Sequence, residues 1–174
     1  DVSLVGSEMC IRDRYYNEPR LIYTAPAFKK GPWKASNRRT VHIAIDVFAN
    51  KGTKLFAPME GEVFTAEYRD SPLDYGGVVI LKHTTPDNDE FFTLYGHLDP
   101  QFLDALQVGD KIDKGQEFCK LGGPDVNGGW APHVHFQIAM TTDGMEADWP
   151  GVADPDDLNF WNSVCPNPAS MLNL

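Results

Sequence analysis

Two histidines occupy alternate positions in an apolar stretch of the sequence, Pro132-His133-Val134-His135-Phe136-Gln137-Ile138. The β-branched and aromatic residues around them favour a strand, and alternate residues of a strand point to the same side of a sheet. His133 and His135 are therefore predicted to lie side by side, where imidazoles could bind a metal ion or carry a proton near neutral pH. Two surface histidines on a half-exposed strand are the alternative interpretation.

A histidine and a carboxylate lie four positions apart far upstream, at His42 and Asp46. The alternating apolar residues around them predict a strand with both side chains on its other face. In a straight strand the two Cα atoms would be about 13 Å apart, too far to share one ion. If they share one, we expect a bulge or tight turn around Ala44. A capping carboxylate and a half-buried imidazole would explain the same two residues without a metal.

The two remaining histidines also follow strand-like sequences. His83 ends Val79-Ile80-Leu81-Lys82-His83, and His97 lies in Tyr95-Gly96-His97-Leu98. Cysteine offers no second kind of metal site, because Cys10, Cys119 and Cys165 are widely separated and form no CxxC pair.

The elements that would position these residues are short strands separated by turn residues. The predicted strands are 41–48, 54–57, 62–68, 77–84, 90–96, 116–121 and 133–140, with a further short strand at 20–24 and a loop at 26–37. Short helices are predicted over 100–106 and 155–164, the second with Asp154 as its N-cap and Pro155 at its first position. This pattern indicates a mostly β fold of antiparallel strands, with short helices toward the C-terminal end.

Length and composition exclude several classes of protein. With 174 residues, 42% of them hydrophobic, the chain is expected to form one domain with its own core. A formal net charge of −10 argues against nucleic acid as a partner, because phosphate binding needs clustered lysine and arginine. No apolar stretch approaches the about 18 residues of a membrane-spanning helix, so no membrane partner is expected.

Several motifs, in order from about Arg39 to Ile138, resemble the LytM and lysostaphin-like zinc metallopeptidases of family M23. They are His42-Ile43-Ala44-Ile45-Asp46, Ala57-Pro58 with Glu60-Gly61-Glu62-Val63, Tyr75-Gly76-Gly77-Val78-Val79-Ile80, Tyr95-Gly96-His97-Leu98, Val108-Gly109-Asp110-Lys111-Ile112 with Lys114-Gly115-Gln116, and His133-Val134-His135-Phe136. The resemblance implies a LytM-like antiparallel sheet with hairpins, similar to a barrel-sandwich hybrid.

The resemblance also implies one zinc ion per chain, held by His42, Asp46 and His135, and hydrolysis of peptide bonds, with peptidoglycan cross-bridges as a candidate substrate. Two nitrogens and one carboxylate leave a fourth tetrahedral position for water, which is typical of catalytic zinc. The chain has no HExxH glutamate, so His133 is expected to be the base and His97 to stabilise the oxyanion or donate a proton. These two roles could be exchanged.

Two features depart from the family pattern. Ala44 stands where the family usually has glycine, so the bend must use a conformation open to an L-residue. The loop 122–130 lacks the family's usual threonine-glycine phrase. This loop and the stretches 71–76 and 161–168 are similar to a peptidase module found between a kinase-like phosphotransferase domain and a class III aminotransferase in long bacterial chains. That resemblance implies these two domains as covalently linked partners and a cytoplasmic location. Without it, the cell envelope is expected.

The sequence divides into four parts. Residues 1–14 resemble a translated sequencing adapter and are set aside from the fold. Residues 15–39 are expected to form an N-terminal extension, residues 40–140 the peptidase-like domain, and residues 141–174 a C-terminal loop, helix and linker.

Two other functions fit parts of the pattern. The glycine turns at 57–63 and 108–115 also resemble biotinyl and lipoyl carrier domains, but the lysine at a hairpin tip that those domains need is absent. A metal-binding but non-hydrolytic regulatory module of a larger cytoplasmic protein is the second alternative. Such relatives usually lose a metal ligand, and this chain keeps all three.

Overall fold

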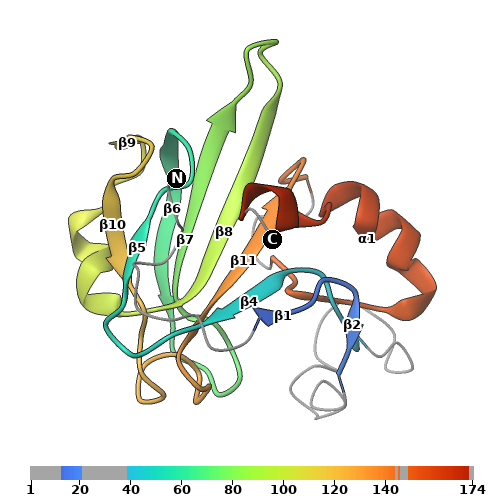
Figure 1. Cartoon of the computed structure of the whole chain (residues 1–174), viewed down its shortest axis with the longest axis horizontal. Helices are drawn as coiled ribbons and strands as arrows, with labels where there is room; N and C mark the ends of the chain where they lie inside the picture. The colour runs from blue at the N-terminus through green and yellow to red at the C-terminus, as the bar shows by residue number, and fades with distance from the viewer. Residues whose placement is uncertain (1–12, 21–38, 144, 146–148, 173–174) are drawn as a thin grey trace.

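A computed structural model of the chain describes residues 13–20, 39–143, 145 and 149–172. Its largest element is a seven-stranded antiparallel sheet in the order β1-β4-β11-β8-β7-β6-β9 (Figure 1). In that order the strands are Asp13–Arg14, Ile45–Phe48, His133–Ala139, Glu90–Leu98, Gly76–Thr84, Gly61–Arg69 and Lys111–Ile112. The predicted mostly β, antiparallel fold is confirmed.

Two smaller sheets complete the β structure. Strand β5 (Lys54–Phe56) pairs with β10 (Glu117–Lys120), and β3 (Val41–His42) lies between β2 (Glu18–Pro19) and β12 (Val152–Ala153). The two-residue strands β1, β2, β9 and β12 were not predicted, because alternation cannot be recognised over two residues, whereas β3 lies within the predicted strand 41–48. The predicted strand at 20–24 and loop at 26–37 lie almost wholly outside the described residues. Asp13 and Arg14, set aside with the adapter-like segment, pair with β4.

The helices among the described residues are short, and all but the last lie within the predicted ranges 100–106 and 155–164. They are η3 (Pro100–Ala105), η4 (Pro155–Asp157), α1 (Leu158–Val164) and η5 (Pro168–Met171). The Asp154 side chain accepts a hydrogen bond from the backbone N–H of Asp156, as its predicted N-cap role requires. No helix of the described chain is both long and apolar enough to cross a membrane.

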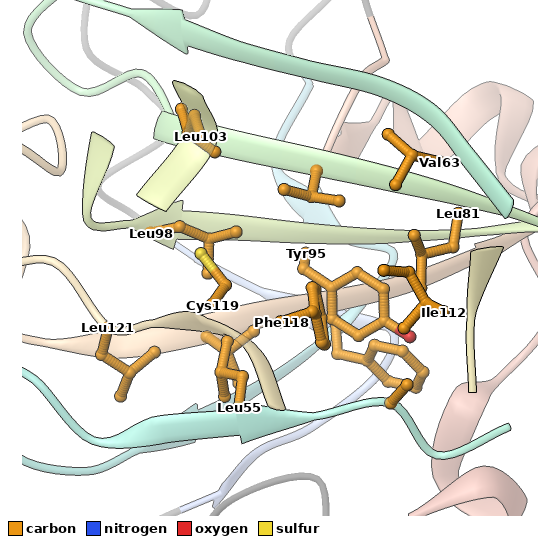
Figure 2. Packing of buried hydrophobic residues seen from close by; sticks show 14 of the residues in the cluster. Leu55, Val63, Leu81, Tyr95, Leu98, Leu103, Ile112, Phe118, Cys119 and Leu121 are labelled. Atoms are coloured by element: carbon orange, nitrogen blue, oxygen red, sulfur yellow. The ribbon is translucent and has the colours of Figure 1, made fainter. Parts of the chain in front are cut away.

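The central strands of the large sheet, β11, β8 and β7, are largely buried on both faces. Successive residues of a strand point to opposite sides, so each strand contributes to both. On one face, Val134 and Phe136 of β11 pack with residues of β8, β5 and β10. Tyr95, Leu55 and Phe118 are among these residues (Figure 2). The other face packs against the C-terminal segment, whose helix α1 lies on the opposite side of the sheet from β5 and β10 (Figure 1). His133 and His135 alternate with Val134 and Phe136, so they belong to this second face.

Candidate metal centre

Strand register brings together two of the three predicted ligands. Strand β11 lies between β4 and β8, and His135 pairs with Asp46 on one side and Gly96 on the other. Side chains of directly paired residues extend from the same face with their Cβ atoms about 5 Å apart. The Asp46 carboxylate therefore meets the His135 imidazole without any long loop.

His42 reaches the same point because the predicted strand 41–48 is broken. Residues Val41–His42 belong to the three-stranded sheet and Ile45–Phe48 to the seven-stranded sheet, with a bend at Ala44 between them. The predicted bend around Ala44 is thus present, and the prediction of one continuous strand is wrong. Ala44 is not among the described residues with positive φ, so the bend suits an L-residue.

Three side-chain atoms form a triangle of the size that a tetrahedral ion needs. His42 Nε2 lies 3.0 Å from His135 Nδ1 and 3.2 Å from Asp46 Oδ1, and His135 Nδ1 lies 3.3 Å from that oxygen. Ligands held about 2.0–2.1 Å from a tetrahedral zinc ion are themselves about 3.3 Å apart. The three side chains are almost completely buried, and the spacing of these atoms fits a small divalent cation. Arg20 Nη2 lies 2.9 Å from His42 Nδ1 and can only donate, so Nε2 of a neutral His42 carries the ring proton and would have to lose it to a bound ion.

The carboxylate of Asp46 is held in its ionised form. Burial raises its pKa, but interactions with His42, His135 and His133 outweigh burial and place the pKa well below its usual value. The buried guanidinium of Arg20 acts in the same direction, since Nη1 donates to Asp46 Oδ2 at 2.7 Å. Oδ1, in contrast, is buried with no hydrogen-bond donor among the described residues. A buried anionic oxygen without a donor is the feature that a bound cation would satisfy.

His133 and His97 lie beside the triangle in one defined tautomer. His133 Nδ1 donates to the carbonyl of Ala131 at 2.6 Å, and His97 Nδ1 donates to the carbonyl of Asn127 at 3.0 Å. A carbonyl oxygen only accepts, so the proton of each neutral ring is on Nδ1 and Nε2 keeps its lone pair. His133 Nε2 is 3.7 Å from Asp46 Oδ1, and the ring centroids of His97 and His133 are 4.2 Å apart.

A β-bulge, which the sequence did not reveal, turns His97 toward the site. Gly77 pairs with Leu98 and Val79 with Tyr95, so Gly96 and His97 together oppose one residue of β7. Regular alternation would place His97 on the same face as Tyr95, away from His133. His97 adopts a left-handed conformation with φ of 66°, which a bulge accommodates and which histidine tolerates better than most residues.

The loop 122–131 is held together by the buried side chain of Asn127. Its Oδ1 accepts from Trp130 N at 3.0 Å, and its Nδ2 donates to the carbonyls of Trp130 and Gly122 at 3.0 and 3.4 Å. The same residue presents the backbone carbonyl that fixes His97. Trp130 is half-buried, with its ring 6.0 Å from that of His97. Asn127 therefore connects the shape of this loop to the tautomer of His97.

Asn127→Ala is expected to lower the free energy of unfolding by about 1–3 kcal/mol, because backbone groups that the amide satisfies lose their partner. Denaturant unfolding of the metal-free protein measures this, with Asn50→Ala at an exposed loop position as the control. Equal stability of the two variants would contradict the role assigned to the Asn127 side chain.

The fifth histidine, His83, does not belong to the site. Its Nδ1 donates to the carbonyl of Glu60 at 2.6 Å, and the Thr93 hydroxyl lies 2.7 Å from its Nε2. It is a buried and hydrogen-bonded core residue, which serves below as a control.

Acid is expected to destabilise the metal-free protein between pH 6.5 and pH 5. Burial lowers the pKa of His42 to about 4, despite attraction to Asp46, and it also lowers the pKa of His83, His97 and His133. The unfolded chain takes up protons below pH 6.5 that the folded chain does not, so stability present above pH 6.5 is lost as the pH falls. For His42 alone this amounts to about 2 kcal/mol at pH 5. A denaturation midpoint that stays constant from pH 7 to pH 5 would contradict this expectation.

The structure adds three polar residues that sequence reasoning missed. Arg20 contacts Asp46, Asn127 contacts His97, and Gln137 Oε1 lies 3.0 Å from His135 Nε2. Only Gln137 could have been placed near the site from the sequence, because it is two residues beyond His135 and therefore on the same face of the strand.

Comparison with known proteins places this geometry in a family. Residues 40–147 match peptidase family M23. The catalytic domain of lysostaphin, an antimicrobial peptidase from Staphylococcus simulans, is similar with a TM-score of 0.56 and 22% sequence identity, over 94% of this chain and 92% of that one. Csd3 from Helicobacter pylori is similar with a TM-score of 0.51 and 19% identity, over 92% of this chain and 39% of that one.

These structural similarities show a shared fold. No curated protein matches the chain significantly. The family match, by contrast, extends over more than half of the sequence and contains both the broken strand with His42 and Asp46 and the strand with His133 and His135. The chain belongs to peptidase family M23.

Proposed function

We propose that this M23 peptidase is a zinc-dependent metalloendopeptidase with one zinc ion per chain. The observation that carries the proposal is the triangle of His42 Nε2, Asp46 Oδ1 and His135 Nδ1, with sides of 3.0–3.3 Å around a buried oxygen that lacks a hydrogen-bond donor. Two imidazoles and one carboxylate are the donor set of an open, catalytic zinc site, whereas a closed structural site uses four protein ligands.

His42, Asp46 and His135 would hold the ion. A zinc ion in such a site supplies Lewis acidity to a substrate carbonyl and makes water a stronger nucleophile near neutral pH. Asp46 contributes the negative charge that offsets part of the charge of the ion, and Arg20 fixes the carboxylate through its other oxygen. Asp46 would thus be a buried carboxylate ligand whose position is fixed by Arg20.

His133 would act as the general base. Its Nε2 carries a lone pair and lies 3.7 Å from Asp46 Oδ1, beside the atoms that would bind the ion. Burial lowers its pKa, so the ring is neutral and able to accept a proton at pH 7. His97 has the same tautomer and could stabilise an oxyanion or donate a proton only after it takes up a proton at Nε2.

Peptidoglycan cross-bridges are the substrate class that we propose to test first. Membership of the family supports a peptide substrate, and lysostaphin, which shares the fold, is described as an antimicrobial peptidase. The experiment measures zinc content by elemental analysis, then release of free amines from purified cross-linked peptidoglycan and from synthetic peptides, with and without a zinc chelator.

Chelator-sensitive cleavage of either substrate supports the metalloendopeptidase, and its preference between them defines the substrate. Stoichiometric zinc with no cleavage of any peptide would instead support a non-hydrolytic metal-binding module. Covalent linkage to phosphotransferase and aminotransferase domains, and a cytoplasmic location, stay predictions that recovery of the surrounding reading frame would test.

A further inference from the structure

A buried hydrogen-bonded chain leads from His135 to the C-terminal segment. His135 Nε2 lies 3.0 Å from Gln137 Oε1, and Gln137 Nε2 lies 3.2 Å from both the carbonyl oxygen of Pro150 and the sulfur of Cys165. Gln137 and Cys165 are both completely buried. Pro150 and Cys165 lie outside residues 40–147, which match the family.

The partners of Gln137 determine which way its amide points. The Pro150 carbonyl can only accept, so it must face the NH2 group of the amide. Burial raises the pKa of the Cys165 thiol to about 11, so the sulfur is a neutral group that can accept a hydrogen bond from the second N–H. With both N–H groups used in this way, the amide oxygen is the atom left facing His135.

The orientation of the amide in turn determines the tautomer of His135. An amide oxygen accepts, so His135 Nε2 must carry the proton and donate it. The lone pair is then on Nδ1, the atom that lies 3.0 Å from His42 Nε2 and 3.3 Å from Asp46 Oδ1. A reversed amide would present an N–H to Nε2, move the ring proton to Nδ1 and remove the ligand.

We propose that Gln137, with its amide orientation fixed by Pro150 and Cys165, is a positioning residue that keeps Nδ1 of His135 available as a metal ligand. The C-terminal segment would then supply part of the support of the metal site. The inference rests on the proposed zinc function only for the identity of the ion, because the tautomer of His135 is a property of the metal-free protein. Partners of this kind around metal-binding histidines typically change metal affinity by about 10- to 100-fold.

Two substitutions of Gln137 separate the hydrogen bond from side-chain volume. Gln137→Met keeps the length of the side chain but has no strong acceptor, and it is expected to raise the Kd for zinc by about 10- to 100-fold. Gln137→Glu keeps an oxygen that accepts from His135 Nε2, and a protonated carboxyl can still donate to the Pro150 carbonyl, so this variant is expected to bind zinc within about threefold of the parent. Zinc affinity is measured by competition with a chromophoric chelator, alongside denaturant unfolding of each metal-free variant.

The buried cysteines provide a matched pair of controls. Cys165→Ala removes one of the two acceptors that orient the amide and is expected to weaken zinc binding by about tenfold, the lower end of the same range. Cys119→Ala removes an equally buried thiol that packs on the opposite face of the sheet, and it should leave zinc affinity unchanged. Cys165→Ser, whose hydroxyl accepts hydrogen bonds, should restore most of the affinity.

A direct readout is the nitrogen-15 NMR spectrum of histidine side chains in the metal-free protein. It is expected to show His135 protonated at Nε2 in the parent, and Gln137→Met should weaken this preference. Some preference should persist, because His42 Nε2 also lies 3.0 Å from His135 Nδ1. A parent with the proton on Nδ1, or a Gln137→Met variant with parental zinc affinity, would overturn the inference. Absence of zinc binding by the parent would overturn the proposed function instead, so the two failures are distinguishable.

Discussion

The His135→Ala variant is expected to contain almost no zinc, whereas the parent should contain about one ion per chain. The substitution removes one of three ligands and leaves the Oε1 atom of Gln137 without its donor. The loss of zinc affinity should exceed the decrease of about 10- to 100-fold that follows when a hydrogen-bond partner of a metal ligand is removed. Peptide hydrolysis should fall with the metal content. Elemental analysis after gel filtration, together with the chelator competition described above, measures the effect.

His83→Ala is the matched control for this variant, because it also removes a buried imidazole from the large sheet. His83 bonds to Glu60 and Thr93, far from the triangle, so its loss should reduce stability and leave zinc content at the parental value. Equal zinc content in His135→Ala and the parent would show that the three side chains do not bind one ion, and the hydrolase proposal would fail with it.

The His133→Ala variant is expected to keep its zinc and lose hydrolysis. His133 contributes no atom to the triangle, since its Nε2 lies 3.7 Å from Asp46 Oδ1 and its Nδ1 is bonded to Ala131. Removal of a general base typically lowers the rate by about 10²- to 10⁴-fold. The measurement is kcat for peptide cleavage on samples whose zinc content is first shown to match that of the parent.

His97→Ala, measured in parallel, assigns the two roles. If His133 is the base, its loss should have the larger effect on kcat, and the ratio of the two effects should reverse if the roles are exchanged. A His133→Ala enzyme with parental kcat would exclude this residue from proton transfer. Loss of zinc from the same variant would show instead that His133 is a ligand.

Short-range patterns in the sequence predicted part of the candidate site, whereas the choice of His42, Asp46 and His135 as ligands came from the resemblance to family M23. Alternation placed His133 and His135 on one face of a strand, and the misfit of His42 and Asp46 in a straight strand predicted a bend near Ala44. Helix capping by Asp154 was predictable for the same reason, since the N-cap and the N–H that it satisfies are two residues apart.

Other features of the site depend on contacts that no local pattern contains. Arg20 meets Asp46 across 26 positions, and Cys165 meets Gln137 across 28. The bulge that turns His97 depends on how β8 pairs with β7, and regular alternation would have placed this histidine on the wrong face.

The sequence by itself determined the longer strands and their buried faces, because these depend on the alternation of neighbouring side chains, and it supplied the residue types that can bind a metal ion. Only the tertiary structure decided which atoms meet, which tautomers His97, His133 and His135 adopt and that one oxygen of Asp46 lacks a hydrogen-bond donor among the described residues. The physical reason is that a hydrogen bond forms only within a few tenths of an ångström and a narrow range of angles. Such distances are set by strand register and by segments far apart in the chain.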